Sequence, residues 1–168
     1  MQILHAHAPP VYLPVPPLRV QGIQLVDAVG QSFLLRGVNM PGLESISPPS
    51  TADLEAVRQM TSVTFRLIQQ RWNANCVRLP VSVQLWLRDG KQYLDQVSAV
   101  VKLATDAGLI VVLAANDTGS QLPSEDTVAF WKTWHRFFKK MGGLFSTSTT
   151  NRIPIKLQAI NGRPGGLE

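Results

Sequence analysis

Apolar positions along this chain alternate between short continuous runs and longer stretches with helical spacing. The runs at 76–81 and 109–116 are nearly all apolar, as strands that are covered on both faces require. Helical spacing occupies 50–72, 93–108 and 124–141. Strands that alternate with helices at this spacing predict successive βα units and a parallel sheet.

Capping signals mark the ends of these helices. Ser50 follows two prolines, and Asp53 completes the spacing of a capping box, while Asn73 or Asn75 suits the left-handed turn at the end of the same helix. Ser124 precedes two acidic residues that oppose the dipole of the third helix. The residues expected to face the core are Leu54, Val57, Phe65, Ile68 and Trp72 in the first helix, Leu94, Val97, Val101 and Ala104 in the second, and Val128, Trp131, His135 and Phe138 in the third.

The N-terminal residues have a different character. Residues 1–21 are rich in proline, which predicts an extended arm of polyproline type. Two apolar runs around Asp27–Gly30 predict a β-hairpin that leads into a strand at about 33–39. His5 and His7 make a poor metal site in such an arm, so we expect neither a metal nor another cofactor.

Composition narrows the function classes. With 168 residues and 45% hydrophobic content, one domain with a real core is expected. The formal charge of +5 includes no long Lys/Arg run, so no nucleic-acid partner is expected. No apolar run reaches the roughly 18 residues of a membrane span, and no secretory signal is visible, which leaves the compartment open. Cys76 is the single cysteine, and its apolar surroundings favour an inert core thiol.

Four stretches carry a family resemblance, namely "VDAVGQSFLLRGVNMPGLE", "NANCVRLPVS", "YLDQVSAVVKLATDAGLIVVLAAN" and "FWKTWHRFF". In order and spacing they resemble the opening of glycoside hydrolase family 5, the cellulase-like (β/α)8 barrels. The resemblance implies an α/β fold in which 22–143 form the first three βα units of a partial TIM barrel, preceded by the hairpin. Whether a fourth strand follows is left open, and residues 144–168 are expected to form an irregular tail.

The family implies hydrolysis of β-linked sugars with retention by two glutamates, one after an Asn at the end of strand four and one on strand seven. Retention requires two carboxyl groups about 5–5.5 Å apart. Neither family glutamate is identified in this chain, so no catalytic residue is assigned. Its glutamates, Glu44, Glu55, Glu125 and Glu168, lie in a loop, at two helix starts and at the last position.

Four residues are candidates for the substrate cleft. Arg78 matches the family arginine that supports the nucleophile, although an ion pair at the end of the barrel is an alternative. Asn116 stands where many members carry a histidine, and it can bond a sugar hydroxyl together with Asp117. Asn39 ends the first strand and either orients cleft groups or forms a turn.

The segment "LFSTSTTNRIPIK" (144–156) lacks the expected strand and acid. Codons read one base out of step can spell Val-Phe-Asp-Leu-Tyr followed by Asn-Glu-Pro-His, so one hypothesis is a one-base insertion or deletion near codons 139–144. The alternative is an evolved tail, in which 153–160 forms strand four and 161–164 is a decayed motif.

Three functions are considered for this sequence, of which an unrelated α/β domain with a small-molecule or nucleic-acid role lacks the support of a phosphate-binding glycine loop. Two others are favoured. The first is a fragment of a retaining hydrolase of β-linked polysaccharide, inactive as written, and the second is a non-catalytic module that binds a glycan or another half-barrel. The expected partner is a polysaccharide or oligosaccharide. Open sheet edges also predict self-association, because unpaired strands invite pairing.

Overall fold

The computed structural model describes residues 18–45, 58–117, 124–138, 144–146 and 157–159. In chain order its elements are β1 (Arg19–Gln21), β2 (Gln24–Val26), β3 (Gly37–Asn39), the 3-10 turn η1 (Leu43–Ser45), α2 (Ser62–Arg71), β4 (Cys76–Ser82), α3 (Val83–Asp89), α4 (Lys91–Asp106), β5 (Ile110–Asn116), α5 (Glu125–Phe138), β6 (Leu144–Ser146) and β7 (Leu157–Ala159).

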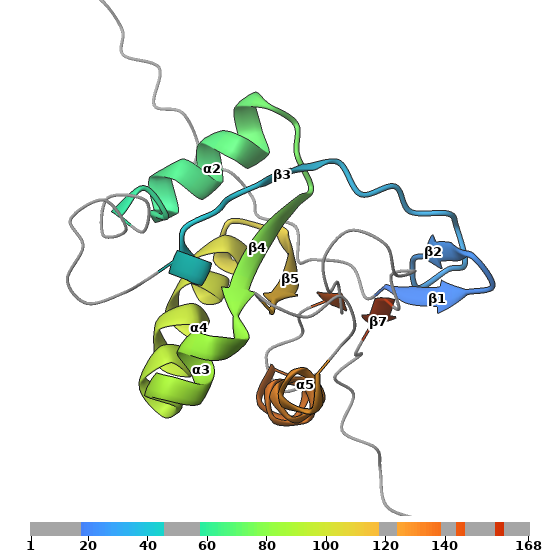
Figure 1. The fold of residues 1–168 in the computed structure, drawn as a ribbon. Coiled ribbons are helices and arrows are strands. Elements are labelled where there is room, and N and C mark those ends of the chain that lie inside the picture. Colours follow the sequence, from blue (N-terminus) through green and yellow to red (C-terminus); the bar gives the residue numbers. More distant parts are fainter. Residues whose placement is uncertain (1–17, 46–57, 118–123, 139–143, 147–156, 160–168) are drawn as a thin grey trace, which may run out of the picture.

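The main sheet has the strand order β3-β4-β5-β6-β7 (Figure 1). The first four strands pair in parallel, and helices follow β3, β4 and β5 along the chain. This arrangement is three βα units and a fourth parallel strand, as the sequence predicted. The strongest pairing joins β4 to β5 over seven register pairs, from Cys76–Ile110 to Ser82–Asn116.

The two faces of this sheet are covered differently. Odd-numbered residues of β4 and β5, among them Leu79 and Leu113, are fully buried against the helices, including Phe65 of α2 and Val97 of α4. Even-numbered residues form the opposite face, which we call the inner face. At its amino end Cys76 packs with Ile110 and Leu18, and Leu25 of β2 packs against this cluster. Arg78, the next inner-face residue of β4, is exposed, whereas Pro80 and Ala114 beyond it are buried.

Pro80 lies inside β4, in register with Ala114 of β5, although proline is disfavoured in central strands. Cys76 donates its N–H to Arg36, and Arg78 accepts from the Met40 N–H, so the even residues of β4 bond toward β3. Since β3 ends opposite Arg78, the missing N–H of Pro80 removes no ladder bond. The strand therefore continues to Ser82 instead of closing at the proline.

The N-terminal prediction needs correction. The hairpin pairs β1 with β2 around Gly22, which has a φ of 61° that glycine adopts without strain. Asp27–Gly30 form the turn that follows, closed by a single bridge from Val26 to Ser32. Strand β1 thus lies inside the predicted arm, and residues 1–17 lie outside the described part. The predicted strand at 33–39 is ladder-paired only in its last three residues.

The first predicted helix begins later than expected, whereas the buried face of the second agrees with its prediction. Thr61 caps α2 by accepting from the Thr64 N–H, so this helix begins at Ser62, and Ser50 and Asp53 lie outside the described residues. Trp72 is 67% exposed, so its predicted core position is wrong, whereas Asn73 takes the left-handed turn as expected. The predicted inner residues of α4 are confirmed as buried: Leu94, Val97, Val101 and Ala104.

The third helix, α5, is rotated relative to the prediction. Its buried residues are Thr127, Phe130, Trp134 and Phe138, of which only Phe138 was predicted. Val128 is 45% exposed, and Trp131 and His135 are half-buried. Aromatic residues lie on both sides of this helix, so hydrophobic spacing alone did not select the buried face.

The chain after residue 143 is not wholly irregular. Strand β6 pairs in parallel with β5, from Val112–Leu144 to Leu113–Phe145, and takes the place of the fourth barrel strand. Strand β7 lies within the alternative fourth strand predicted at 153–160, but it runs antiparallel to β6. That alternative is therefore wrong in its topology. Residues 147–156 and 160–168 lie outside the described part.

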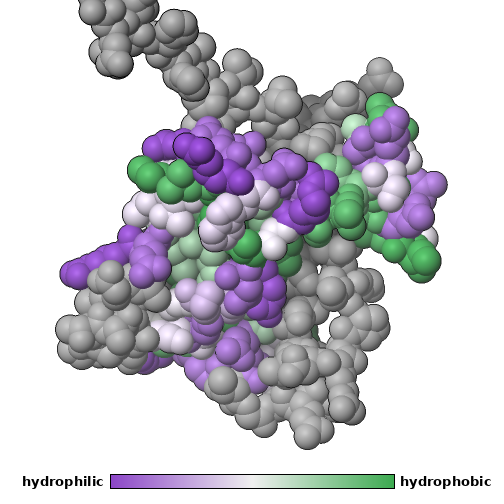
Figure 2. Space-filling view, turned by 90° about the horizontal axis from the view of Figure 1, so that it is seen from above, coloured by the Kyte–Doolittle hydropathy of each residue, from purple (hydrophilic) through white to green (hydrophobic). Residues whose placement is uncertain are grey.

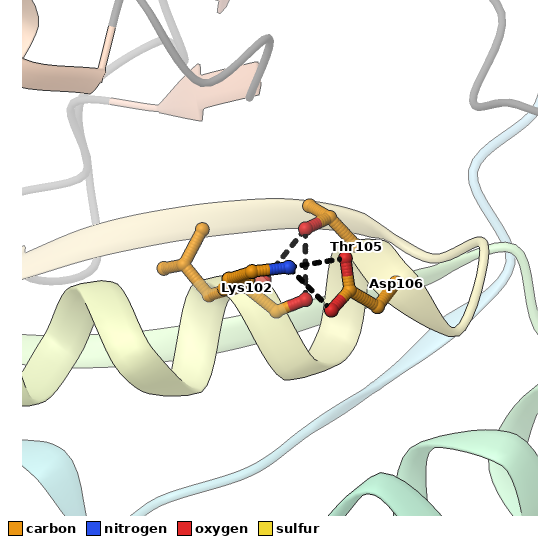
Figure 3. A network of polar contacts seen from close by, with 4 residues as sticks. Lys102, Thr105 and Asp106 are labelled. Carbon is orange, nitrogen blue, oxygen red and sulfur yellow. Dashed lines mark hydrogen bonds and ion pairs between the residues drawn. The ribbon is translucent and has the colours of Figure 1, made fainter.

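On the face shown in Figure 2, the described residues include both polar and apolar side chains, with apolar ones exposed at the hairpin among other places. Ile23 and Val29 are the most exposed large apolar side chains among the described residues. On α4, Lys102 donates to both oxygens of Asp106 at 2.9 and 2.7 Å, beside Thr105 (Figure 3). Such exposed i,i+4 pairs contribute only about 0.3–0.5 kcal/mol. None of the described helices combines the length and apolarity of a membrane span.

Candidate functional site

Arg78 and Asn39 meet on the inner face. They are register partners on β4 and β3, and the Arg78 guanidinium donates to the Asn39 Oδ1 at 2.6 Å. Val77 and Leu79 on either side of Arg78 are fully buried on the helix side, which fixes the backbone and sends the arginine to the inner face. Arg78 is exposed, and its described side-chain partner is the amide oxygen of Asn39. The pair presents a fixed cation on the open face of the sheet.

Asn116 lies apart from this pair. It ends β5 in register with Ser82 and is half-buried on the inner face. The register partner of Arg78 is Val112, four residues earlier, so at about 3.3 Å per residue the two levels are separated by roughly 13 Å. The four predicted cleft residues therefore divide into an Arg78–Asn39 pair and an Asn116–Asp117 corner at the carboxyl edge.

Asp117 is buried and fully engaged with neighbouring side chains. Its Oδ2 accepts from the Thr127 hydroxyl at 2.6 Å and the Ser124 hydroxyl at 2.7 Å, and its Oδ1 accepts from the Gln84 amide at 2.8 Å. The hydroxyls of Thr127 and Ser124, followed by the smaller contribution of Gln84, hold the pKa of Asp117 below its usual value against the effect of burial. This geometry favours a carboxylate that anchors α5 and α3 over one that contacts a sugar.

Sequence reasoning missed a second polar centre, Tyr93. Its hydroxyl donates to the Leu43 carbonyl and accepts from the Ser82 N–H, both at 2.8 Å. The tyrosine is buried, and burial raises its pKa, so it stays neutral. Ser82 in turn caps α3 by accepting from the Leu85 N–H at 3.1 Å. The cap was readable as a serine before a helical run, but the tyrosine contact joins residues 50 positions apart.

No catalytic pair of carboxylates occurs on the inner face of β3, β4 and β5, whose polar members there are Asn39, Arg78, Ser82 and Asn116. Glu44 accepts from the Gly42 N–H at 2.7 Å and so stabilises its own turn. Over the described ranges no three His, Cys, Asp or Glu side chains gather as a metal site would require. Burial raises the pKa of the Cys76 thiol, which suits a core residue.

The family model described as cellulase, glycosyl hydrolase family 5, matches residues 26–152, more than half of the chain. The chain belongs to this cellulase family. The match continues past residue 143 into the segment that was predicted to be an irregular tail. None of the curated proteins compared matches the chain.

Several solved structures share its fold. The catalytic domain of Thermobifida fusca endoglucanase Cel5A, solved in complex with cellotetraose, superposes with a TM-score of 0.62 at 19% identity, covering 78% of this chain and 42% of that one. A GH5 cellulase from an Icelandic hot spring isolate gives a TM-score of 0.53 at 16% identity, with 76% and 35% covered. A structure from Cytophaga hutchinsonii gives 0.56 at 20%, with 74% and 37% covered. The chain thus spans less than half of the cellulases it resembles.

Proposed function

We propose that the chain is the N-terminal part of a retaining glycoside hydrolase for β-linked polysaccharides of the cellulose or β-glucan type, and that it does not hydrolyse them by itself. It supplies one wall of a substrate cleft, with Arg78 and Asn39 at its centre and Asn116 at its edge. Family membership supports the reaction class. Cellotetraose in the Thermobifida fusca enzyme supports the substrate class.

The observation that carries this proposal is the character of the inner face. Arg78 offers a guanidinium fixed by Asn39, which suits the support of a nucleophilic carboxylate by charge and hydrogen bonding. Retention needs two carboxyl groups about 5–5.5 Å apart, and the described inner face carries none. Residues that can position a nucleophilic carboxylate, without the carboxylate itself, are consistent with one part of a glycoside hydrolase.

The first experiment compares the chain with a version whose reading frame is restored. We expect sequencing of the gene around codons 139–144 to reveal the offset frame, and the restored protein to cleave cellotetraose with retention, followed by NMR of the anomeric proton. The 168-residue chain should release no sugar, and Arg78→Met should abolish activity of the restored protein. An intact frame with hydrolysis by the 168-residue chain contradicts the proposal.

The exposed Arg78–Asn39 pair also favours a second candidate, a module that binds a glycan without cleaving it. Affinity electrophoresis in gels that contain a soluble β-glucan tests this candidate. Retardation that is lost in Arg78→Ala but kept in Arg71→Ala, an exposed arginine on α2, supports it. Equal mobility in gels with and without the glucan removes it.

The same open geometry supports self-association through the edge strand β3. The N–H of Met40 and the C=O of Arg36 bond to β4, so the alternating residues Gly37 and Asn39 direct their backbone groups away from it. Sedimentation velocity at several concentrations tests this association. We expect Asn39→Pro, which removes an edge N–H, to weaken it more than Asn39→Ala, and a monomer at all concentrations refutes it.

A further inference from the structure

Hydrogen bonds link the loops at the carboxyl edge of the sheet in a series that we call the rim network. Its members are Leu43, Tyr93, Ser82, Gln84, Asp117, Ser124 and Thr127. Tyr93 ties the loop after β3 to the end of β4. Asp117, at the end of β5, ties that strand to the start of α5. Each of these two centres is buried, so each is a fixed point at this edge.

Gln84 is the one link between the two centres in the described part of the chain. It belongs to the first turn of α3, directly after β4, and its Nε2 donates to the Asp117 Oδ1 at 2.8 Å. Its Oε1 lies 3.4 Å from the Ser82 Oγ, a weak contact on the same side of the edge. Gln84 is exposed as a whole residue, so only its amide group is committed to this contact.

The link spans the two strand ends that carry cleft residues. Ser82 and Asn116 are register partners and the last inner-face residues of β4 and β5. Gln84 follows Ser82 by two residues, and Asp117 follows Asn116 directly. The hydrogen bond between Gln84 and Asp117 therefore joins the segments that follow β4 and β5, just beyond the Ser82–Asn116 register pair.

We propose that Gln84 is a positioning residue of the substrate cleft, which locks the start of α3 to the end of β5 through Asp117 and so fixes Asn116 at the mouth. This role deepens the proposed hydrolase function, because it assumes that the mouth receives the sugar. The tests below involve no sugar, so their failure is distinguishable from failure of the hydrolase proposal.

The surroundings of Asp117 make a charge substitution informative. From α3 the carboxylate faces the Gln84 amide, and from α5 it faces the hydroxyls of Ser124 and Thr127, all uncharged. Glu125 and Asp126 in the first turn of α5 are exposed. Gln84→Glu therefore places a second carboxylate against Asp117, where two like charges at hydrogen-bond distance raise the pKa of one of them strongly.

The sign of the pH dependence then reports the contact. When the pKa of one carboxyl group is raised in the folded state, the folded protein becomes more stable as pH falls. The urea midpoint of Gln84→Glu should therefore rise from pH 7 to pH 5. Gln92→Glu, at an exposed glutamine of α4, is the matched control and should show no such rise. Folding of Gln84→Glu only at the lower pH supports the proposal equally. The same pH profile for both variants overturns it.

Hydrogen exchange of Gln84→Ala provides the second measurement. The Thr127 N–H donates to the Ser124 Oγ and reports the first turn of α5, while the Leu85 N–H donates to the Ser82 Oγ and reports the first turn of α3. Each should exchange about fivefold faster or more, the factor that corresponds to the loss of one hydrogen bond. Amides in the middle of α4 should be unchanged, as in Gln92→Ala. Unchanged exchange at both reporter amides overturns the lock.

Discussion

Replacing Asp117 by alanine tests the anchor on which the carboxyl edge depends. The wild-type carboxylate accepts three hydrogen bonds at 2.6–2.8 Å, and bonds to a charged group contribute about 1.5–3 kcal/mol each. The variant regains part of this hydrogen-bond free energy. Ser124 and Thr127 hydroxyls already lie 3.1 Å apart and can bond to each other, and the exposed Gln84 amide can turn to water. We therefore expect the free energy of unfolding to fall by about 2–4 kcal/mol.

Urea unfolding followed by tryptophan fluorescence measures this loss, since Trp131 and Trp134 lie on α5. The pKa of Asp117 is lowered in the folded state, so its contribution is present above the unfolded value of about 3.9 and is lost as pH falls through the lower folded value. The difference between wild type and Asp117→Ala should shrink accordingly at pH 3. A difference below about 0.5 kcal/mol at pH 7, within the usual range of surface substitutions, refutes this reasoning.

Three other substitutions probe the core. In Gly37→Ala the new Cβ would lie 2.1 Å from the Cys76 carbonyl oxygen, so β3 must move, and we expect a loss of about 3 kcal/mol in urea unfolding. Unchanged stability would contradict the close approach of β3 to β4. Tyr93→Phe leaves two buried backbone groups unpaired and should cost about 1–3 kcal/mol, with a cost near zero as the contrary result. Trp134 stacks on Phe130 at 4.3 Å, and its buried Nε1 has no acceptor among the described residues, so Trp134→Phe should cost less than about 1.5 kcal/mol by calorimetry. A loss above 3 kcal/mol would show that the indole N–H is paired in solution.

The parallel core was predictable because its signals are long and unambiguous. The run at 109–116 is typical of a buried strand and the spacing of Leu94, Val97, Val101 and Ala104 of an amphipathic helix, and both predictions are confirmed. The hairpin was harder, since strands of three residues carry little pattern and Gly22 rather than Gly30 forms the turn between them. Helix α3 was missed because it begins directly after β4 with no intervening loop.

The candidate site was predictable only in part. Arg78 and Asn39 were identified separately, and parallel register brings them together. The sugar contact of Asp117 stays a prediction, but its hydrogen bonds to Gln84 and Thr127 could not be foreseen, because these residues are 33 and 10 positions away in the sequence. Thr127 is buried because it serves this carboxylate, which hydrophobic spacing does not reveal. Specific polar contacts between elements therefore account for the rotation of α5 away from its predicted face.

The most direct test of the central claim is an assay of the purified 168-residue chain on cellotetraose, with release of shorter sugars followed over days. If the chain supplies only one wall of a cellulase cleft, no product should form above the rate in buffer. Release of glucose or cellobiose that disappears in Arg78→Met would contradict the account, because the chain would then contain the complete catalytic machinery.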